Sequence, residues 1–284
     1  MRRSSIAALA ILTAAIFAAA AFDWPIDGGK FRFGFGTPRG GFLRGMEFGS
    51  GDGLVRAADD GELAFVYDGP RLPGGYPLSG NSLLVLAHVS DISTIYVGME
   101  RGSVSSYLKN VRRGDVLGRS PESKAGRGTT VYAFDAKERR YINPLIIMPA
   151  QPDSKPPVVK SAALSADGVE TVIDQATSVR QGSYDLLLDT YDVSPAGAQT
   201  APYDIRVIID GSERARVVYD AAWASSGASS LFGSRSTSEE SFLTDDERIR
   251  FGPYALARGR VIVAVIVSDY AGNRREQSYS ITVR

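Results

Sequence analysis

The chain contains no cysteine and only one histidine, His88, among its 284 residues. Disulfide bonds and thiol catalysis are therefore excluded. Zinc and other borderline metals are held in proteins mostly by thiolate and imidazole groups, so the usual zinc triads are excluded as well, and a His-x-His pair cannot occur. A serine hydrolase with a histidine base would have to use His88.

Neither sign of charge is in excess, because 32 lysines and arginines balance 32 aspartates and glutamates. A chain without net charge has no global field that steers it toward a polyanion. We therefore expect no nucleic-acid partner.

Glycine and proline are frequent, at 30 and 14 residues, and helical periodicity is nearly absent. Short runs of strand-forming residues lie between glycine-rich turns. We expect strands over residues 30–35, 61–68, 82–88, 94–99 and 128–134 in the first half of the chain, and over 183–191, 203–209, 260–269 and 276–284 in the second. The sequence predicts an all-β fold, with an antiparallel sandwich in the second half.

Residues 1–21 have the three parts of a secretory signal peptide. Arg2 and Arg3 give a basic start, residues 6–17 form a short apolar run, and residues 18–21 are all alanine. A membrane anchor needs about 20 apolar residues, so we expect cleavage near Ala21 and an exported protein that is periplasmic or associated with the cell envelope. The alternative is an uncleaved segment, the only source of membrane contact that we expect.

A proline-rich stretch divides the rest of the chain. Residues 149–157 contain four prolines, a composition typical of a stiff, extended connector. We therefore expect one domain over 22–150, a linker over 151–158 and a second domain over 159–284. Within the second domain, the serine-rich residues 224–241 are predicted to form a long exposed loop that covers Trp223; an exposed Trp223 that stacks on a ligand is the alternative.

The first domain contains a series of short motifs in a fixed order. They are Phe33-Gly-Phe-Gly-Thr-Pro-Arg39, a strand pair at 45–48 and 55–63, a hairpin at 81–88 and 94–99, the turn Val111-Arg-Arg-Gly-Asp-Val-Leu-Gly118, the strand at 130–134 and the exit Ile142-Asn-Pro-Leu145. In this order they resemble the lysostaphin/LytM-type zinc peptidases, which cut peptide cross-links in peptidoglycan. The resemblance implies a glycine-rich β fold called the duplicated hybrid motif.

The zinc ligands of that family are not matched. The family binds zinc through a His-x-x-x-Asp motif and the second histidine of a His-x-His pair, and a further histidine lies on the hairpin strand. Aligned through Gly45 and the Asn-Pro exit, these positions hold Leu43 and Glu47, Thr130 and Tyr132, and Gly98. A catalytic zinc needs about three protein ligands and an open water position. The resemblance therefore implies a degenerate peptidase with no metal site and no catalytic residues.

The side chains at these positions predict a groove. Thr130 and Tyr132 share one face of a strand, so we expect both to face the former active-site groove, with Leu43, Glu47 and Tyr96 at its edges. Glu47 is expected to be solvated or salt-bridged. We expect Tyr96 and Tyr132 to be core or groove-wall aromatics, because a phenol with a pKa near 10 is a poor proton shuttle.

His88 aligns with a histidine that is not a zinc ligand of the resembling family. We expect His88 to lie at the end of a strand and to bond the neighbouring backbone; a role in the groove is the alternative.

The end of the chain, with Val265-Ile-Val-Ser-Asp269-Tyr-Ala-Gly-Asn273 before a final alternating strand, resembles the immunoglobulin-like or fibronectin-like modules of bacterial surface proteins. That resemblance implies a β-sandwich and no particular activity.

These features together favour an exported protein that binds rather than cleaves. Degenerate members of the resembling family regulate cell-wall hydrolases or scaffold envelope complexes, so the expected partner is peptidoglycan or an envelope protein such as a cell-wall hydrolase. Two alternatives stay open. One is an active zinc metalloendopeptidase with atypical ligands, for example Glu47 and His88. The other is a purely structural envelope component.

Overall fold

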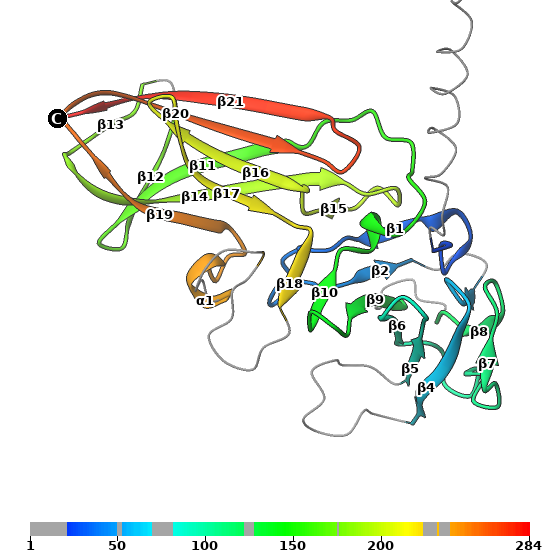
Figure 1. Ribbon diagram of the computed structural model, residues 1–284. Helices are drawn as coiled ribbons and strands as arrows, with labels where there is room; N and C mark the ends of the chain where they lie inside the picture. The colour runs from blue at the N-terminus through cyan, green and yellow to red at the C-terminus, as the bar shows by residue number, and fades with distance from the viewer. Residues whose placement is uncertain are drawn as a thin grey trace, which may run out of the picture.

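The computed structural model describes residues 22–49, 53–69, 82–121, 128–174, 176–223, 232 and 239–284. The protein is all-β, as the sequence predicts, and its sheets are almost entirely antiparallel (Figure 1). No helix among these residues is long and apolar enough to cross a membrane. The predicted signal peptide lies outside the described residues.

The N-terminal unit is built from short strands and two 3-10 turns. Its elements are η1 (Asp27–Gly29), β1 (Phe31–Phe33), β2 (Met46–Phe48), β3 (Leu54–Arg56), β4 (Gly61–Asp68), β5 (Ser82–Ala87), β6 (Ile92–Val97), β7 (Asn110–Val111), β8 (Val116–Arg119), β9 (Thr130–Asp135), β10 (Arg140–Ile142) and η2 (Pro144–Ile146).

One large sheet organises this unit, with the strand order β1-β2-β9-β6-β5-β4-β7. Strand β9 pairs with β6 along its whole length and shares its other edge between β2, at Thr130 and Val131, and β10, at residues 133–135. Alternate side chains of β9 point to opposite faces of the sheet. Val131 therefore packs in the main core of the unit with Tyr96 and Leu84, whereas Tyr132 lies on the other face.

The C-terminal unit has longer strands and one short helix. Its elements are β11 (Val158–Ala166), β12 (Val169–Val172), β13 (Ser178–Val179), β14 (Gly182–Val193), β15 (Gln199–Thr200), β16 (Asp204–Ile209), β17 (Ser212–Val218), β18 (Ala221–Trp223), α1 (Glu239–Phe242), β19 (Ile249–Leu256), β20 (Gly259–Ser268) and β21 (Arg274–Val283).

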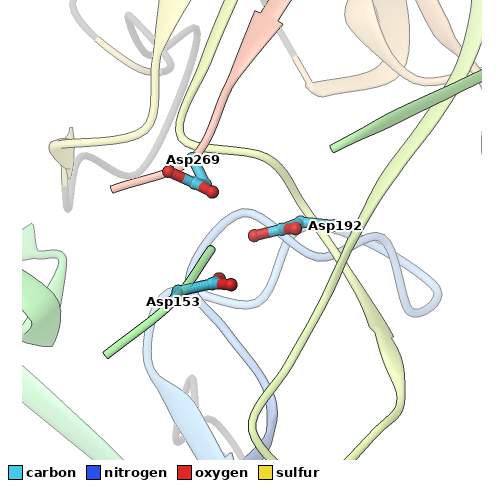
Figure 2. A group of neighbouring side chains, drawn as sticks. All are labelled: Asp153, Asp192 and Asp269. Carbon is cyan, nitrogen blue, oxygen red and sulfur yellow. The ribbon is translucent and has the colours of Figure 1, made fainter. Parts of the chain in front are cut away.

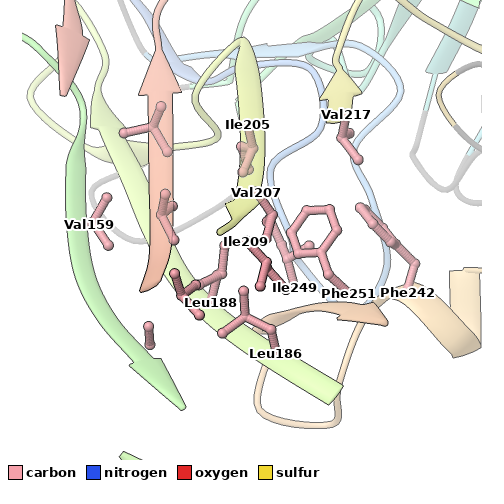
Figure 3. Packing of buried hydrophobic residues seen from close by; sticks show 14 of the residues in the cluster. Val159, Leu186, Leu188, Ile205, Val207, Ile209, Val217, Phe242, Ile249 and Phe251 are labelled. Atoms are coloured by element: carbon pink, nitrogen blue, oxygen red, sulfur yellow. The ribbon is translucent and has the colours of Figure 1, made fainter. Parts of the chain in front are cut away.

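Apart from β18, these strands form a sandwich of two sheets. One sheet has the order β12-β11-β14-β15, with β19 also paired to β14, and the other has the order β13-β21-β20-β16-β17. Aliphatic side chains of β14 and β16 interleave with Ile249 and Phe251 of β19 between the sheets (Figure 3). Residues 151–157, which precede β11, form no helix or strand.

The two units share a sheet and a core. Strand β18 leaves the sandwich and pairs with β10, which extends the N-terminal sheet across the junction (Figure 1). Tyr219, fully buried, packs against Phe42 of the N-terminal unit and against Phe232. The units on either side of the connector are therefore joined by a strand pairing and by shared aromatic packing.

The region predicted to be a long exposed loop, 224–241, lies mostly outside the described residues. Where it is described, the prediction is wrong for Phe232, which is only 5% exposed in the aromatic cluster of the junction. Trp223 is half-buried at the end of β18, and the Arg140 guanidinium lies 5.8 Å from its ring centroid.

Candidate functional site

The face of the N-terminal sheet that carries Thr130 and Tyr132 is the one on which the sequence predicts a groove. Glu47 of β2 lies directly opposite Thr130, so their side chains share this face, and Val97 of β6 lies opposite Thr130 on its other side. Three of the predicted residues, Glu47, Thr130 and Tyr132, are thus brought together. Leu43 is half-buried in the loop before β2, where its backbone bonds Gly36 and Thr37.

Glu47 is buried and has a cationic partner. It is 4% exposed, and its Oε2 atom lies 3.6 Å from Nη1 of Arg39. The Arg39 guanidinium also lies 3.9 Å from the ring centroid of Phe33, a cation–π contact that holds it over the sheet. The expectation of a salt-bridged carboxylate agrees with this contact, whereas that of a solvated one is wrong.

Aromatic packing fills the part of this face around Tyr132. Its ring lies 5.8 Å from that of Tyr141 on β10, and Tyr141 belongs to the core cluster of the C-terminal unit. On its other side Tyr132 contacts the small cluster of Leu83 and Val97. Gly45 makes this possible, because a Cβ there would overlap the Tyr132 ring and the carbonyl oxygen of Val131. The predicted groove is therefore partly closed by the sandwich.

Tyr96 does not line this groove, which corrects its predicted position at the groove edge. His88 does not line it either, so the geometry does not support the alternative of a groove role for His88. Tyr96 pairs with Val131, not Tyr132, so its side chain points to the opposite face, where it is fully buried. Its hydroxyl oxygen accepts a hydrogen bond from the amide of Ala58, at 3.0 Å. Burial raises the pKa of Tyr96 to about 12, so it is no acid or base at neutral pH.

His88 is 8% exposed and fully engaged at the end of β5. Its Nδ1 atom lies 2.7 Å from the carbonyl oxygen of Asp60, and its Nε2 atom lies 2.8 Å from the hydroxyl of Thr94. The ring also packs edge-on against Phe22, with centroids 5.0 Å apart. The prediction of a strand-end histidine bonded to the neighbouring backbone agrees with this geometry.

Zinc does not fit these residues. Glu47 and His88 lie on opposite faces of the sheet, so they cannot hold one ion, and the remaining predicted positions carry an alkyl, a hydroxyl and a phenol group. Within the described ranges, neither Glu47 nor His88 belongs to a group of three side chains that converge as metal ligands. The alternative of a zinc peptidase built on Glu47 and His88 is therefore not supported by the geometry.

The described residues contain a second polar cluster, at the junction of the two units. Carboxylate oxygens of Asp153 in the connector, Asp192 near the end of β14 and Asp269 after β20 lie within 4.8 Å of one another (Figure 2). They line a cavity of about 560 Å³ to which both units contribute. Tyr203 and Tyr270, whose ring centroids are 5.1 Å apart, form part of its wall.

Burial dominates the electrostatics of this cluster. Asp192 is 9% exposed, and this burial raises its pKa to about 7, although the amide of Val193 opposes the rise by bonding the carboxylate; the charges of Asp269 and Asp153 add to it. Asp269 is 5% exposed, and both of its oxygens accept hydrogen bonds from Asn273. Two or more carboxyl groups that share a buried site hold a proton at unusually high pH.

These carboxylates do not by themselves make a cation site. Calcium takes six to eight oxygen ligands, and the two oxygens of Asp269 are already committed to Asn273. The cluster was not predicted from the sequence, because its members come from a connector, a strand end and a turn that no short motif relates.

Comparison with known proteins gives little further information. Residues 156–284 match the model of an uncharacterised protein family. No curated protein matches the chain. Among solved structures, dimeric latent PorU from Porphyromonas gingivalis is similar over 82% of this chain and 20% of its own, with 13% identity and a TM-score of 0.28. The chain thus spans about a fifth of the length of PorU, and a similarity at this level supports no conclusion about fold or function.

Proposed function

We propose that this chain is an exported, non-catalytic LytM-like protein that binds peptidoglycan or an envelope protein such as a cell-wall hydrolase. The observation that carries the proposal is the pairing of Glu47 with Arg39. Glu47 is the one carboxylate at the positions where the resembling family holds zinc, and a guanidinium supplies the positive charge beside it.

A buried carboxylate needs a compensating charge or proton. In a zinc peptidase the metal ion supplies that charge, and its open coordination position supplies the water. In this chain Arg39 supplies the charge, and a guanidinium keeps its proton and cannot activate water as a metal does. The site is therefore suited to holding a fixed structure and not to hydrolysis.

The accessible part of the former groove is its rim. Leu43 and Thr130 are half-buried, and the Arg39 side chain is 34% exposed, whereas Glu47 is covered. We infer that a partner meets this rim, and that the sandwich acts as a fixed support that closes the other end of the same face.

The test is cosedimentation of the full mature chain with purified peptidoglycan, together with capture of envelope proteins from a membrane-free extract. Leu43→Glu is expected to weaken binding at least severalfold while leaving the thermal unfolding temperature within a few degrees of the parent. Val169→Glu is the matched control, since Val169 is 68% exposed at the start of β12 in the sandwich, and it is expected to bind like the parent.

Equal binding by the parent and Leu43→Glu would show that the partner does not bind at this rim. Binding to neither peptidoglycan nor any envelope protein would favour the second candidate, a purely structural component. That candidate has one observation in its favour: β18 and the aromatic cluster join the two units into one body.

A further inference from the structure

The connector between the two units lies against a cluster of like charges. Gln151 ties it to the N-terminal unit, because its Nε2 atom donates to the carbonyl oxygens of Gly29 and Gly28 at 2.8 and 3.3 Å. Two residues later, the carbonyl oxygen of Asp153 accepts a hydrogen bond of 3.2 Å from Nδ2 of Asn273 in the sandwich. The segment thus crosses the cavity between two anchor points.

The members of the cluster differ in how firmly they are held. Asp192 lies near the end of β14, and Asp269 lies in the turn between β20 and β21, where Asn273 fixes both of its oxygens. Asp153 is exposed and belongs to residues 151–157, which form no helix or strand. Asp153 is therefore the member that moves most easily when the three groups repel one another.

The charged groups around Asp192 can be named element by element. The connector contributes Asp153 and Lys155, and the turn after β20 contributes Asp269; the titratable phenols of Tyr203 and Tyr270 complete the set. The N-terminal unit contributes Phe31, Gly34, Phe35, Asn143 and Leu145, so none of its described residues brings a charge to this wall. Lys155 is exposed and is the one basic side chain in the described lining.

We propose that this junction is a proton-sensitive clasp: residues 152–155 of the connector seat against the sandwich when Asp192, beside Asp153 and Asp269, carries a proton, and loosen when Asp192 is charged. Like charges whose oxygens lie within 4.8 Å of one another disfavour the seated connector, and the 3.2 Å hydrogen bond from Asn273 to the carbonyl oxygen of Asp153 opposes its release. The raised pKa of Asp192 places the change near pH 7. The clasp does not depend on what the N-terminal unit binds.

The absence of cysteine makes the test direct, because two introduced cysteines are the only sites that take a thiol-specific spin label. Spin labels at Ser154→Cys on the connector and Gln277→Cys on β21 report the distance across the clasp, measured by pulsed electron–electron double resonance. Ser212→Cys with Gln277→Cys lies wholly within one sheet of the sandwich and is the control pair. Each pair is measured at about pH 5.5 and at about pH 8.5, which lie on either side of the titration. All four measurements are made in EDTA.

The clasp predicts a longer and broader distance distribution for the 154/277 pair at the higher pH, with a midpoint near 7, and no change for the 212/277 pair. Asp192→Asn is expected to abolish the pH dependence. Asp167→Asn, an exposed turn position whose φ of 50° suits asparagine, is expected to retain it.

Three results would overturn the clasp. They are an unchanged 154/277 distribution, a change that survives in Asp192→Asn, and a change that the control pair shares. A pH dependence that appears only with calcium and is lost in EDTA would also contradict it, because protons alone must drive the change.

Discussion

Glu47 and Asp192 are almost equally buried, at 4% and 9% exposure, yet they are neutralised in different ways. Glu47 has the guanidinium of Arg39 at 3.6 Å. Asp192 faces Asp269 and Asp153, and its pKa rises to about 7 because of burial and these charges. A counter-ion balances the charge of a buried acid without a proton, whereas a proton held by a buried carboxyl group is lost as the pH rises. The first site is therefore fixed and the second is responsive.

The difference follows from where each site lies. Glu47 is on β2, which has a paired strand on each side, and these strands hold its surroundings in place. Asp192 lies where a strand end meets a connector without regular structure, so its surroundings adjust. A buried carboxyl group therefore stabilises a fixed structure at Glu47, whereas at Asp192 it makes the structure depend on pH.

The largest expected effect on stability tests whether the two units, which carry Glu47 and Asp192, are locked together at their junction. Gly36 has a φ of 84°, and a Cβ there would overlap the ring of Tyr219 across the junction. Gly36→Ala is expected to lower stability by about 3 kcal/mol, because overpacking adds to the backbone strain. Calorimetry would show a melting temperature lower by roughly 5–10 °C.

Gly40→Ala is the control for Gly36, because Gly40 also has a positive φ, of 67°, but no neighbour within 4 Å of an added Cβ. If the two variants lose equal stability, only backbone strain matters, and Tyr219 does not lock the units together.

The next effect concerns the paired acid. Arg39→Met keeps the alkyl chain and removes the charge, so that Glu47 is left buried without a counter-ion. We expect a loss of about 2 kcal/mol in the free energy of unfolding, less than for a fully buried pair because Arg39 is partly exposed. Urea titration followed by circular dichroism measures it.

Adding Glu47→Gln to Arg39→Met is expected to restore most of this loss, since the unpaired charge disappears. Arg32→Met is the matched control: Arg32 lies over the same Phe33 ring, at 5.0 Å, and has no carboxylate partner within the described ranges. If Arg32→Met loses as much free energy of unfolding as Arg39→Met, then Arg39 stabilises the protein through its contact with the Phe33 ring and not through its pairing with Glu47.

The smallest expected effect concerns Asp192, which has no counter-ion among the described residues. Its replacement is expected to raise stability, whereas the replacements above lower it. The raised pKa means that folded Asp192 keeps a proton that the unfolded chain releases near pH 4. The stability gained from that proton is complete below about pH 4 and is lost as the pH rises through about 7. Asp192→Asn is therefore expected to melt a few degrees above the parent at pH 8 and to match it near pH 4.

Asp204→Asn is a control of opposite sign for Asp192. Burial favours a higher pKa for Asp204, but hydrogen bonds from Arg216 and Arg206 outweigh it and leave the pKa lowered. Its replacement is expected to destabilise at neutral pH and progressively less as the pH falls. Identical pH profiles for the two variants would contradict the contrast between paired and unpaired acids.

The strands were predictable where the pattern is local. Strand β4 spans the predicted residues, and β5, β16 and β20 differ from their predictions by a residue or two at an end. Strand β11 was not predicted, because Lys160, Ser161 and Ser165 break its apolar pattern. Strand β18 was not predicted either: three residues carry too little periodicity, and its pairing with β10 depends on a distant part of the chain.

The candidate sites show the same limit. Thr130 and Tyr132 were correctly placed on one face, because alternation within a strand fixes the face. Glu47 lies on another strand, and its place beside them was expected only from the family resemblance. Tyr96 was misplaced because its face depends on the register between β6 and β9, which a sequence does not specify. The sequence drew attention to Asn143 within Ile142–Leu145, but it did not predict that Nδ2 of Asn143 donates to the carbonyl oxygen of Tyr219 across the junction, at 2.7 Å.

The proposed function requires that Arg39, and not a metal ion, supplies the positive charge beside Glu47. The most direct test is the metal content of the mature protein, produced without a polyhistidine tag, dialysed against trace zinc and measured by elemental mass spectrometry. We expect far less than one zinc per chain, with no change in Arg39→Met. A zinc content near one per chain, lost on replacing Glu47 by glutamine, would contradict it and make hydrolysis of peptidoglycan the first activity to assay.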